Sequence, residues 1–303
     1  MTLLDRTIVR LLPAVPKPVV QLFSSRYIAG SILEDALRVV RRLNGERKMA
    51  TVAVLGEEIT QESEARAIAQ TYCKVFAAIE SGGLDSNVSV KPTALGLDLS
   101  YDLCRENLES VLREAAKSGN FVRIDMEDSS TTSDTLRLYR ELRGSGFDNV
   151  GVVLQAYLRR SIDDVRALAD LEPNVRLCKG IYVEPPSIAF TDYDAVRANY
   201  VRCLDSLLDA GAYVGVATHD EWLIGEALTR VQRLQPSGYE FQMLLGVREQ
   251  RANELVAAGH RLRVYVPFGE HWYQYSLRRL QENPAMAGTI ARATVGRVLG
   301  RSS

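Results

Sequence analysis

Polar and ionisable side chains recur at the ends of short apolar segments, where a parallel sheet would bring them together. They are Lys91, Asp125, Glu127, Gln155, Arg176, Lys179, Thr218, His219, Asp220, Glu240, Gln242 and Tyr265. Each unpaired buried charge would cost on the order of several kcal/mol. Ion pairs such as Lys91 with Asp125 would absorb some of that cost, but a purely structural role for the whole set is disfavoured. The pattern therefore predicts a concave polar site for a charged small molecule.

Cations dominate this predicted site, because the sequence offers few clear acidic partners for Lys91, Arg176 and Lys179. Such a site suits an anionic substrate, a phosphate-bearing cofactor, or both. The three histidines form no HExxH motif and no ligand-spaced cluster, so we expect no catalytic metal. Lys91 or Lys179 could form a Schiff base, which keeps a barrel aldolase or lyase as an alternative. A catalytically silent barrel that serves as a binding module is the third interpretation.

A second cluster lies near the C-terminus, in the segment HWYQYSLRRLQEN. At helical spacing, Tyr275, Arg278, Arg279 and Glu282 share neighbouring faces, with Arg278 and Glu282 at i, i+4. A surface ion pair of this kind is worth only about a few tenths of a kcal/mol. Paired arginines can also hold a carboxylate through bidentate hydrogen bonds, which is the functional interpretation.

The elements that must position these residues follow from alternating apolar segments and helical periods. Segments rich in Val, Leu and Ile are typical of strands buried in a parallel sheet. The eight predicted strands are Met49–Leu55, Asn87–Lys91, Phe121–Met126, Val150–Gln155, Val175–Lys179, Tyr213–Ala217, Glu240–Leu244 and Arg261–Val266. Helical periods between them cover Tyr101–Lys117, Thr135–Arg143, Asp192–Asp209 and Glu221–Leu234. Gly119, Gly146 and Gly211 stand at helix-to-strand joints, where a C-terminal cap needs a positive φ.

Eight strand–helix units favour a closed barrel over an open doubly wound sheet. The sequence also lacks the GxGxxG turn that holds a dinucleotide on an open sheet. We predict an α/β fold, a (β/α)8 TIM-like barrel over residues 46–303 with a helical N-terminal arm over residues 1–45. Apolar residues on one helical face suggest that the arm caps the bottom or the side of the barrel, with a membrane or partner contact as the alternative. They are Leu3, Leu4, Ile8, Leu11, Leu12 and Val15.

Length and composition limit the class of protein further. The 303 residues carry 37 Lys+Arg against 38 Asp+Glu, which excludes a generally basic nucleic-acid binder. No apolar segment approaches the roughly 20 residues that span a bilayer, and the first residues lack a secretory cleavage site. The four cysteines form no CxxC pair, which fits a reducing compartment. We expect a soluble, cytoplasmic protein with no nucleic-acid partner and, at this length, no fused second catalytic domain.

Taken as a set, the strand ends and the C-terminal cluster resemble the proline dehydrogenase family in its monofunctional bacterial form. The matching segments, in the order of the family, are NVSVKPTALG, VRIDMED, VVLQAYL, RLCKGIYVEP, VATHD, YEFQMLLGVR, RVYVPFG and YSLRRLQEN. The resemblance runs from about Pro13 to Gly288 and includes RYIAG at Arg26–Gly30. One departure is Val183, which follows KGIY where some bifunctional relatives carry Trp.

The resemblance implies an FAD enzyme on a distorted barrel that oxidises L-proline to Δ1-pyrroline-5-carboxylate. For the substrate, it implies that Arg278 and Arg279 bind the carboxylate with help from Lys91, and that Glu282 orients the arginine pair. Tyr265 would pack against the proline ring. The family pattern also places Asp125 near the substrate amine, linked to Lys91. Tyr265 should leave little room for a hydroxyl on the ring, so proline is expected rather than 4-hydroxyproline.

For the cofactor, the resemblance implies that Arg176 forms a hydrogen bond near flavin N5, where negative charge develops. Gln155 and Met126 would line the isoalloxazine ring. The ribityl, pyrophosphate and adenosine portions would be held by Lys179, Gly180, Ile181, Thr218 and His219. The implied partners are a membrane quinone as electron acceptor and, by transient contact, a separate pyrroline-5-carboxylate dehydrogenase. The implied location is the cytoplasm, and peripheral binding at the inner face of the membrane is compatible with it.

Overall fold

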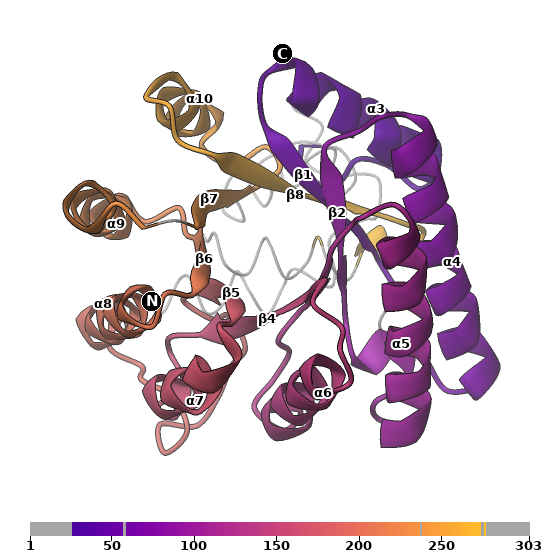
Figure 1. Ribbon diagram of the computed structural model, residues 1–303, viewed down its shortest axis with the longest axis horizontal. Coiled ribbons are helices and arrows are strands. Elements are labelled where there is room, and N and C mark those ends of the chain that lie inside the picture. The colour runs from indigo at the N-terminus through magenta and orange to yellow at the C-terminus, as the bar shows by residue number, and fades with distance from the viewer. Residues whose placement is uncertain (1–25, 57–58, 237, 274–275, 277–303) are drawn as a thin grey trace, which may run out of the picture.

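A computed structural model of the chain describes residues 26–56, 59–236, 238–273 and 276. Eight parallel strands pair in sequence order, and β8 pairs with β1 to close a barrel (Figure 1). The strands are β1 (Met49–Val54), β2 (Ser86–Val90), β3 (Val122–Ile124), β4 (Val150–Gln155), β5 (Asn174–Cys178), β6 (Tyr213–Ala217), β7 (Tyr239–Leu244) and β8 (Leu262–Phe268). This arrangement confirms the predicted (β/α)8 barrel.

Helices surround the barrel and follow its strands along the chain (Figure 1). The α-helices are α3 (Leu33–Gly45), α4 (Glu62–Ser81), α5 (Tyr101–Lys117), α6 (Thr132–Gly144), α7 (Ser161–Leu168), α8 (Tyr193–Asp209), α9 (Glu221–Leu234) and α10 (Glu249–Ala257). Two 3-10 turns are η2 (Thr93–Leu95) and η3 (Ala169–Leu171). Gly119, Gly146 and Gly211 have φ of +63°, +87° and +70°, as the predicted helix ends require.

The segment before β1 packs on the side of the barrel. Helix α3 contacts β1 and β8, and it buries the stripe Ala36, Leu37, Val40 and Leu43. Ahead of α3, the Ala29 amide donates to the Pro267 carbonyl and the Gly269 amide donates to Gly30, which ties the RYIAG segment to the end of β8. The apolar residues predicted to form one face of the arm, from Leu3 to Val15, lie outside the described residues.

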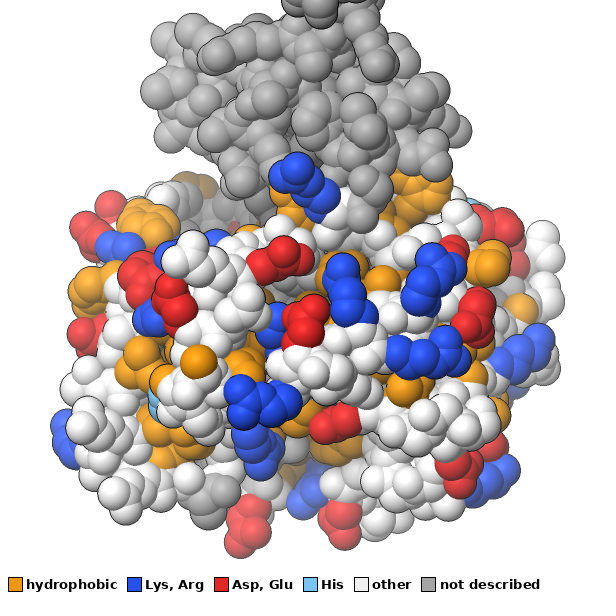
Figure 2. All heavy atoms as spheres, turned by 90° about the horizontal axis from the view of Figure 1, so that it is seen from above, with side chains coloured by type: hydrophobic (Ala, Val, Ile, Leu, Met, Phe, Trp, Pro, Cys, Tyr) orange, Lys and Arg blue, Asp and Glu red, His pale blue; other side chains and the backbone are white. Residues whose placement is uncertain are grey.

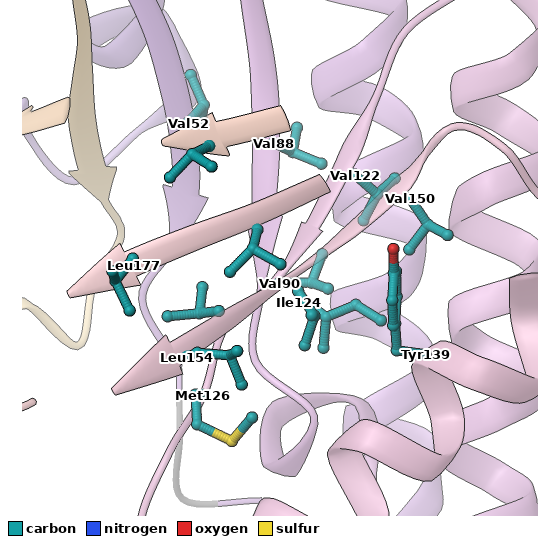
Figure 3. Close-up of a cluster of buried hydrophobic side chains, with 14 of the residues drawn as sticks. Val52, Val88, Val90, Val122, Ile124, Met126, Tyr139, Val150, Leu154 and Leu177 are labelled. Carbon is teal, nitrogen blue, oxygen red and sulfur yellow. The ribbon is translucent and has the colours of Figure 1, made fainter. Parts of the chain in front are cut away.

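The apolar core lies between the barrel and its helices. Figure 3 shows part of it, with valines and leucines of β1 to β5 beside Tyr139 of α6. Residues two apart on a strand face the same side, so Val88 and Val90 lie on one face and Ser89 on the other. The sequence predicts strands that are apolar on both faces, whereas in the structure the helix-facing side is apolar and the inward side carries many polar residues.

The inside of the barrel is polar instead, which is unusual because bulky branched residues usually fill it. Thr51 donates to Asn87, and the Arg123 guanidinium donates to the Val152 and Asn174 carbonyls, all among buried or half-buried groups. Burial lowers the pKa of Arg123 to about 9, with a further contribution from the nearby charge of Arg176. The inward faces of the described strands and the end of β3 carry three guanidinium groups, those of Arg123, Arg176 and Arg263, and the carboxylates of Asp125 and Glu240. The buried carboxylate of Glu127 follows β3.

The outer surface carries mixed charges on the face shown in Figure 2, where Lys and Arg side chains are interspersed with Asp and Glu. The formal net charge of −1 is a sum over the whole chain and does not reveal the guanidinium groups inside the barrel. Within the described ranges, no helix has both the length and the hydropathy that crossing a bilayer requires.

Candidate active site

Asp125 is the centre of a hydrogen-bonded cluster where β3 ends. Its Oδ1 accepts from the Ser89 hydroxyl at 2.5 Å and from Arg176 Nη1 at 2.7 Å, and its Oδ2 accepts from the Tyr265 hydroxyl at 3.1 Å. Asp125 as a whole is 9% exposed. The three donors come from β2, β5 and β8, so closure of the barrel is what brings them together. Both oxygens are held, and the cluster fixes the tyrosine and the arginine relative to each other.

Arg176 lies in the middle of β5 and points into the barrel. Its Nη1 bonds Asp125 and, at 3.2 Å, the Ser89 hydroxyl, while its Nε donates to Gln242 Oε1 at 2.5 Å. Its guanidinium carbon is 5.4 Å from the centre of the Tyr265 ring, close enough for a cation–π contact. Arg176 therefore forms an ion pair with Asp125, while the expected link between Lys91 and this carboxylate stays a prediction.

A second carboxylate, Glu127, fixes the segment that follows β2. It accepts from the Thr93 amide at 2.9 Å and from the Thr93 hydroxyl at 2.7 Å, at the start of η2. Burial raises the pKa of Glu127, opposed by the two Thr93 hydrogen bonds and by the charge of Lys91. Because Lys91 lies two residues before Thr93, Glu127 stabilises the backbone next to the lysine.

The end of β4 contributes Gln155, which is 3% exposed. Its amide nitrogen donates to the carbonyls of Met126 and Glu127 at 3.0 and 3.2 Å. Its amide oxygen is buried and has no hydrogen-bond partner among the described residues. Met126 meets Gln155 through its backbone, because its thioether lies in the apolar core near Leu154 (Figure 3).

A second ionic cluster lies between the ends of β5 and β6. Asp220 accepts from Arg197 Nη2 at 2.7 Å, from the Tyr193 hydroxyl at 2.6 Å and from Lys179 Nζ at 3.2 Å. Burial alone would raise the pKa of Asp220, but these hydrogen bonds and the charge of Lys179 hold it well below its ordinary value. Asp220 also caps α9 by accepting from the Trp222 amide. Lys179 therefore has an acid partner, contrary to the expectation of few clear acids.

The remaining predicted cofactor residues border this cluster. The Thr218 hydroxyl accepts from the Asp220 amide at 3.1 Å. His219 Nε2 accepts from the Leu244 amide at 3.0 Å, so in the neutral ring the proton is on Nδ1. Gly180 has φ +101°, a conformation that favours glycine, and Ile181 beside it is 37% exposed. These residues form one edge of the barrel, on the loops after β5 and β6.

Some sequence-predicted positions fall elsewhere. Glu240 is the second residue of β7 and bonds Arg263 and Tyr213, so it lies at the floor of the barrel rather than at the strand's end. The cluster of Tyr275, Arg278, Arg279 and Glu282 lies outside the described residues. Its proposed grip on a carboxylate stays a prediction.

Three residues of the clusters carried no sequence signal strong enough to find them. Ser89 alternates with valines in NVSVK, and only the inward face of β2 gives it a role. Tyr193 and Arg197 lie one helical turn apart at the start of α8, a spacing that is also typical of a solvated helix surface. Their common partner Asp220 is 27 and 23 residues away in the sequence, a pairing that spacing alone does not reveal.

A flavin dinucleotide fits the polar groups of this edge. The unpaired Gln155 oxygen can accept from a ring N–H, and the Arg176 guanidinium can donate to a ring nitrogen or oxygen. Lys179 and Arg197 supply positive charge for a pyrophosphate, although both already share Asp220. Exposed Tyr193 and Trp222 supply aromatic surface beside them.

Comparison with known proteins points to one family. The family model described as proline dehydrogenase matches residues 36–292. Proline dehydrogenase 1 of Bacillus subtilis strain 168 is 39% identical over 274 residues, which cover 90% of this chain and 90% of the relative. Proline dehydrogenase of Deinococcus radiodurans is 36% identical over 275 residues, which cover 89% of each chain.

Solved structures agree on the fold. The crystal structure of proline utilization A from Bdellovibrio bacteriovorus, inactivated by N-propargylglycine, superposes with a TM-score of 0.80 at 28% identity. The match covers 86% of this chain and 32% of that one. Proline utilization A from Corynebacterium freiburgense gives a TM-score of 0.77 at 23% identity, over 97% of this chain and 34% of that one, and supports the fold alone.

Proposed function

Because the chain belongs to the proline dehydrogenase family, we propose that it oxidises L-proline to Δ1-pyrroline-5-carboxylate with FAD as cofactor and a membrane quinone as electron acceptor. The observation that carries the proposal is that Asp125, Arg176 and Tyr265, which the family resemblance assigns to substrate and flavin, meet in one hydrogen-bonded cluster. Bound FAD would supply the chemistry of accepting a hydride, that is, two electrons and one proton, from proline.

The residues of the cluster would bind and orient the substrate. Tyr265, with its hydroxyl fixed by Asp125, would present its ring to the apolar face of proline. Arg278, Arg279 and Lys91 would hold the carboxylate, and Glu282 would orient the arginine pair. Fixing the carboxylate and the ring together restricts the substrate to one pose, which is the main gain from proximity.

The guanidinium groups inside the barrel would favour a neutral substrate amine. A secondary amine gives up a hydride from the adjacent carbon most easily when its nitrogen has a free lone pair. The positive charges of Arg123, Arg176 and Arg263 disfavour an ammonium ion and should lower the pKa of the bound amine. Asp125 would lie near this amine, but Arg176 already offsets its charge.

The same edge of the barrel would hold the cofactor. Arg176 and Gln155 would bond the isoalloxazine ring, and Met126 would approach it through its backbone. Lys179, Gly180, Ile181, Thr218 and His219 would hold the ribityl, pyrophosphate and adenosine portions. Residues 46–303 would form the catalytic barrel and residues 1–45 its arm. The product would pass to a separate pyrroline-5-carboxylate dehydrogenase by transient contact, and the protein would act in the cytoplasm or at the inner face of the membrane.

Turnover with trapped product tests this proposal. Protein supplied with FAD, L-proline and a soluble quinone should accumulate Δ1-pyrroline-5-carboxylate, which condenses with o-aminobenzaldehyde to a yellow adduct, one molecule for each quinone reduced. Borohydride added during turnover should leave Lys91 and Lys179 without a substrate adduct in the mass spectrum. A trapped lysine adduct, with no Δ1-pyrroline-5-carboxylate formed and no quinone reduced, would favour the redox-neutral Schiff-base aldolase or lyase instead.

A further inference from the structure

A buried chain of hydrogen bonds joins Arg176 to the floor of the barrel. Gln242, on β7, accepts from Arg176 Nε at 2.5 Å through its amide oxygen and donates to Glu240 Oε1 at 2.6 Å through its amide nitrogen. Gln242 is 7% exposed and Glu240 is 2% exposed. The family resemblance assigns neither residue to the substrate or the cofactor, and both lie on the same inward face of one strand.

The chemistry of its two neighbours fixes the orientation of the Gln242 amide. A guanidinium group can only donate hydrogen bonds, and an ionised carboxylate can only accept them. The amide oxygen must therefore face Arg176 and the amide nitrogen must face Glu240. A flipped amide would set its nitrogen against a donor and its oxygen against an acceptor, so this side chain has one stable arrangement.

Glu240 is a fixed end point for this chain. Besides Gln242, it accepts from Arg263 Nε at 2.7 Å and Nη2 at 3.2 Å, and from the Tyr213 hydroxyl at 2.8 Å. Burial would raise the pKa of Glu240, but the charge of Arg263 and these hydrogen bonds lower it below its ordinary value. Arg263 is itself tied to the Ala50 carbonyl of β1. The Glu240 carboxylate is therefore held by side chains from three strands, β6, β7 and β8.

A glycine in the neighbouring strand makes room for Gln242. A Cβ at Gly215, in the middle of β6, would lie 2.4 Å from Gln242 Nε2. Glycine inside a strand weakens it and often marks a close approach of another group. Gly215 therefore weakens β6 locally, and its missing side chain leaves space for the Gln242 amide group.

We propose that Gln242, anchored by Glu240, is a positioning residue that sets the plane of the Arg176 guanidinium for the reaction. Asp125 holds Nη1 and Gln242 holds Nε, so two edges of the same planar group are fixed from different strands of the barrel. With Nη1 alone held, the long side chain could pivot about that bond, away from the like charge of Arg123. The inference rests on the proposed function, in which Arg176 donates to the flavin.

The test compares Gln242→Met with a matched control. Methionine keeps the length of the side chain but can neither accept from Arg176 nor donate to Glu240. Gly215→Ala displaces the same amide without changing Gln242 or Arg176. The control is Thr51→Val, which also removes one buried hydrogen bond inside the barrel, that with Asn87 rather than with Arg176. Melting temperature and FAD content establish that each variant is folded and loaded.

In Gln242→Met, the rate constant for flavin reduction at saturating proline should fall about tenfold, as expected from loss of one hydrogen bond to a charged group. The proline dissociation constant should change less than about twofold. The flavin midpoint potential should fall by about 30 mV, which corresponds to tenfold for a two-electron couple. Gly215→Ala should lower the rate constant for flavin reduction and the midpoint potential as well, and Thr51→Val should change neither of them.

Crystals of the cofactor-free variant separate this inference from the proposed function. The Arg176 guanidinium should rotate away from its wild-type plane in Gln242→Met, whether or not the protein binds flavin. A protein that binds no FAD contradicts the proposed function and leaves this readout intact. An Arg176 that keeps its position, an unchanged potential, or equal shifts in Thr51→Val would each overturn the positioning role.

Discussion

Replacing Arg176 with methionine is expected to lower the rate constant for proline-dependent flavin reduction about 100- to 1,000-fold. That range is typical for the loss of one donor aimed at developing negative charge. Arg176 is 8% exposed and is held by Asp125, Ser89 and Gln242, so water cannot readily substitute for it. Stopped-flow mixing of the oxidised variant with L-proline under anaerobic conditions gives the rate constant directly.

The same change also removes an ionic partner of Asp125, so its effect on stability must be separated from its effect on the reaction. An uncompensated buried charge costs about 3–5 kcal/mol. We expect Arg176→Met to melt at a lower temperature, and the double variant with Asp125→Asn to recover most of that loss without recovering activity. Recovery of activity in the double variant would show that Arg176 acts only by neutralising Asp125.

Two single variants serve as controls for the arginine. Arg176→Lys keeps the charge but cannot bond Asp125 and Gln242 at once, so it should stay at least about tenfold below the wild type. Arg113→Met removes an exposed arginine that pairs with Glu109 on the surface of α5, and it should leave the rate constant unchanged. A fully active Arg176→Met would contradict the proposed role.

Gly180→Ala is expected to weaken FAD binding at least tenfold. At φ +101° an L-residue is strained, and the added Cβ would lie 2.0 Å from the Tyr157 ring. Tyr157 also anchors the loop after β5, because its amide donates to the Lys179 carbonyl and its carbonyl accepts from the Phe190 amide. Moving Tyr157 should therefore displace Lys179 from Asp220 and disturb the proposed pyrophosphate contacts. Titration of the apoprotein with FAD measures the dissociation constant.

Gly259→Ala is the matched control for this glycine. Gly259 also has a positive φ, of +88°, but its added Cβ would meet nothing within 4 Å. Both variants should lose about 1 kcal/mol or more of stability from backbone strain, and only Gly180→Ala should lose cofactor affinity. Equal FAD affinities in the two variants would show that the loop after β5 does not carry the cofactor.

Much of the fold could be predicted from the sequence because its signals are local. Helices α5 and α9 begin and end at the predicted residues, and β4 and β6 match theirs, since apolar periodicity and capping residues act within a few positions. β3 is three residues long instead of the predicted six, because regular pairing stops before the cluster at Asp125. Strand ends of this kind are less certain than the existence of a strand.

The pairing of charges could not be predicted, because it depends on register and on barrel closure. Asp125 and Arg176 are 51 residues apart, and only the stagger of β3 to β5 decides that they meet. The same geometry places Glu240 at the barrel floor and Gln242 level with Arg176, although both looked alike as polar residues of one strand. Arg197 bonds Asp220 from helix α8, so a search for polar residues at the ends of strands does not find it.

The most direct test of the proposed activity is an anaerobic titration of the FAD-loaded protein with L-proline, followed by the flavin absorbance. We predict that the oxidised spectrum bleaches fully with about one proline per flavin, and that adding a quinone restores it. A protein that cannot be loaded with FAD, or a flavin that stays oxidised at saturating L-proline, would contradict the account.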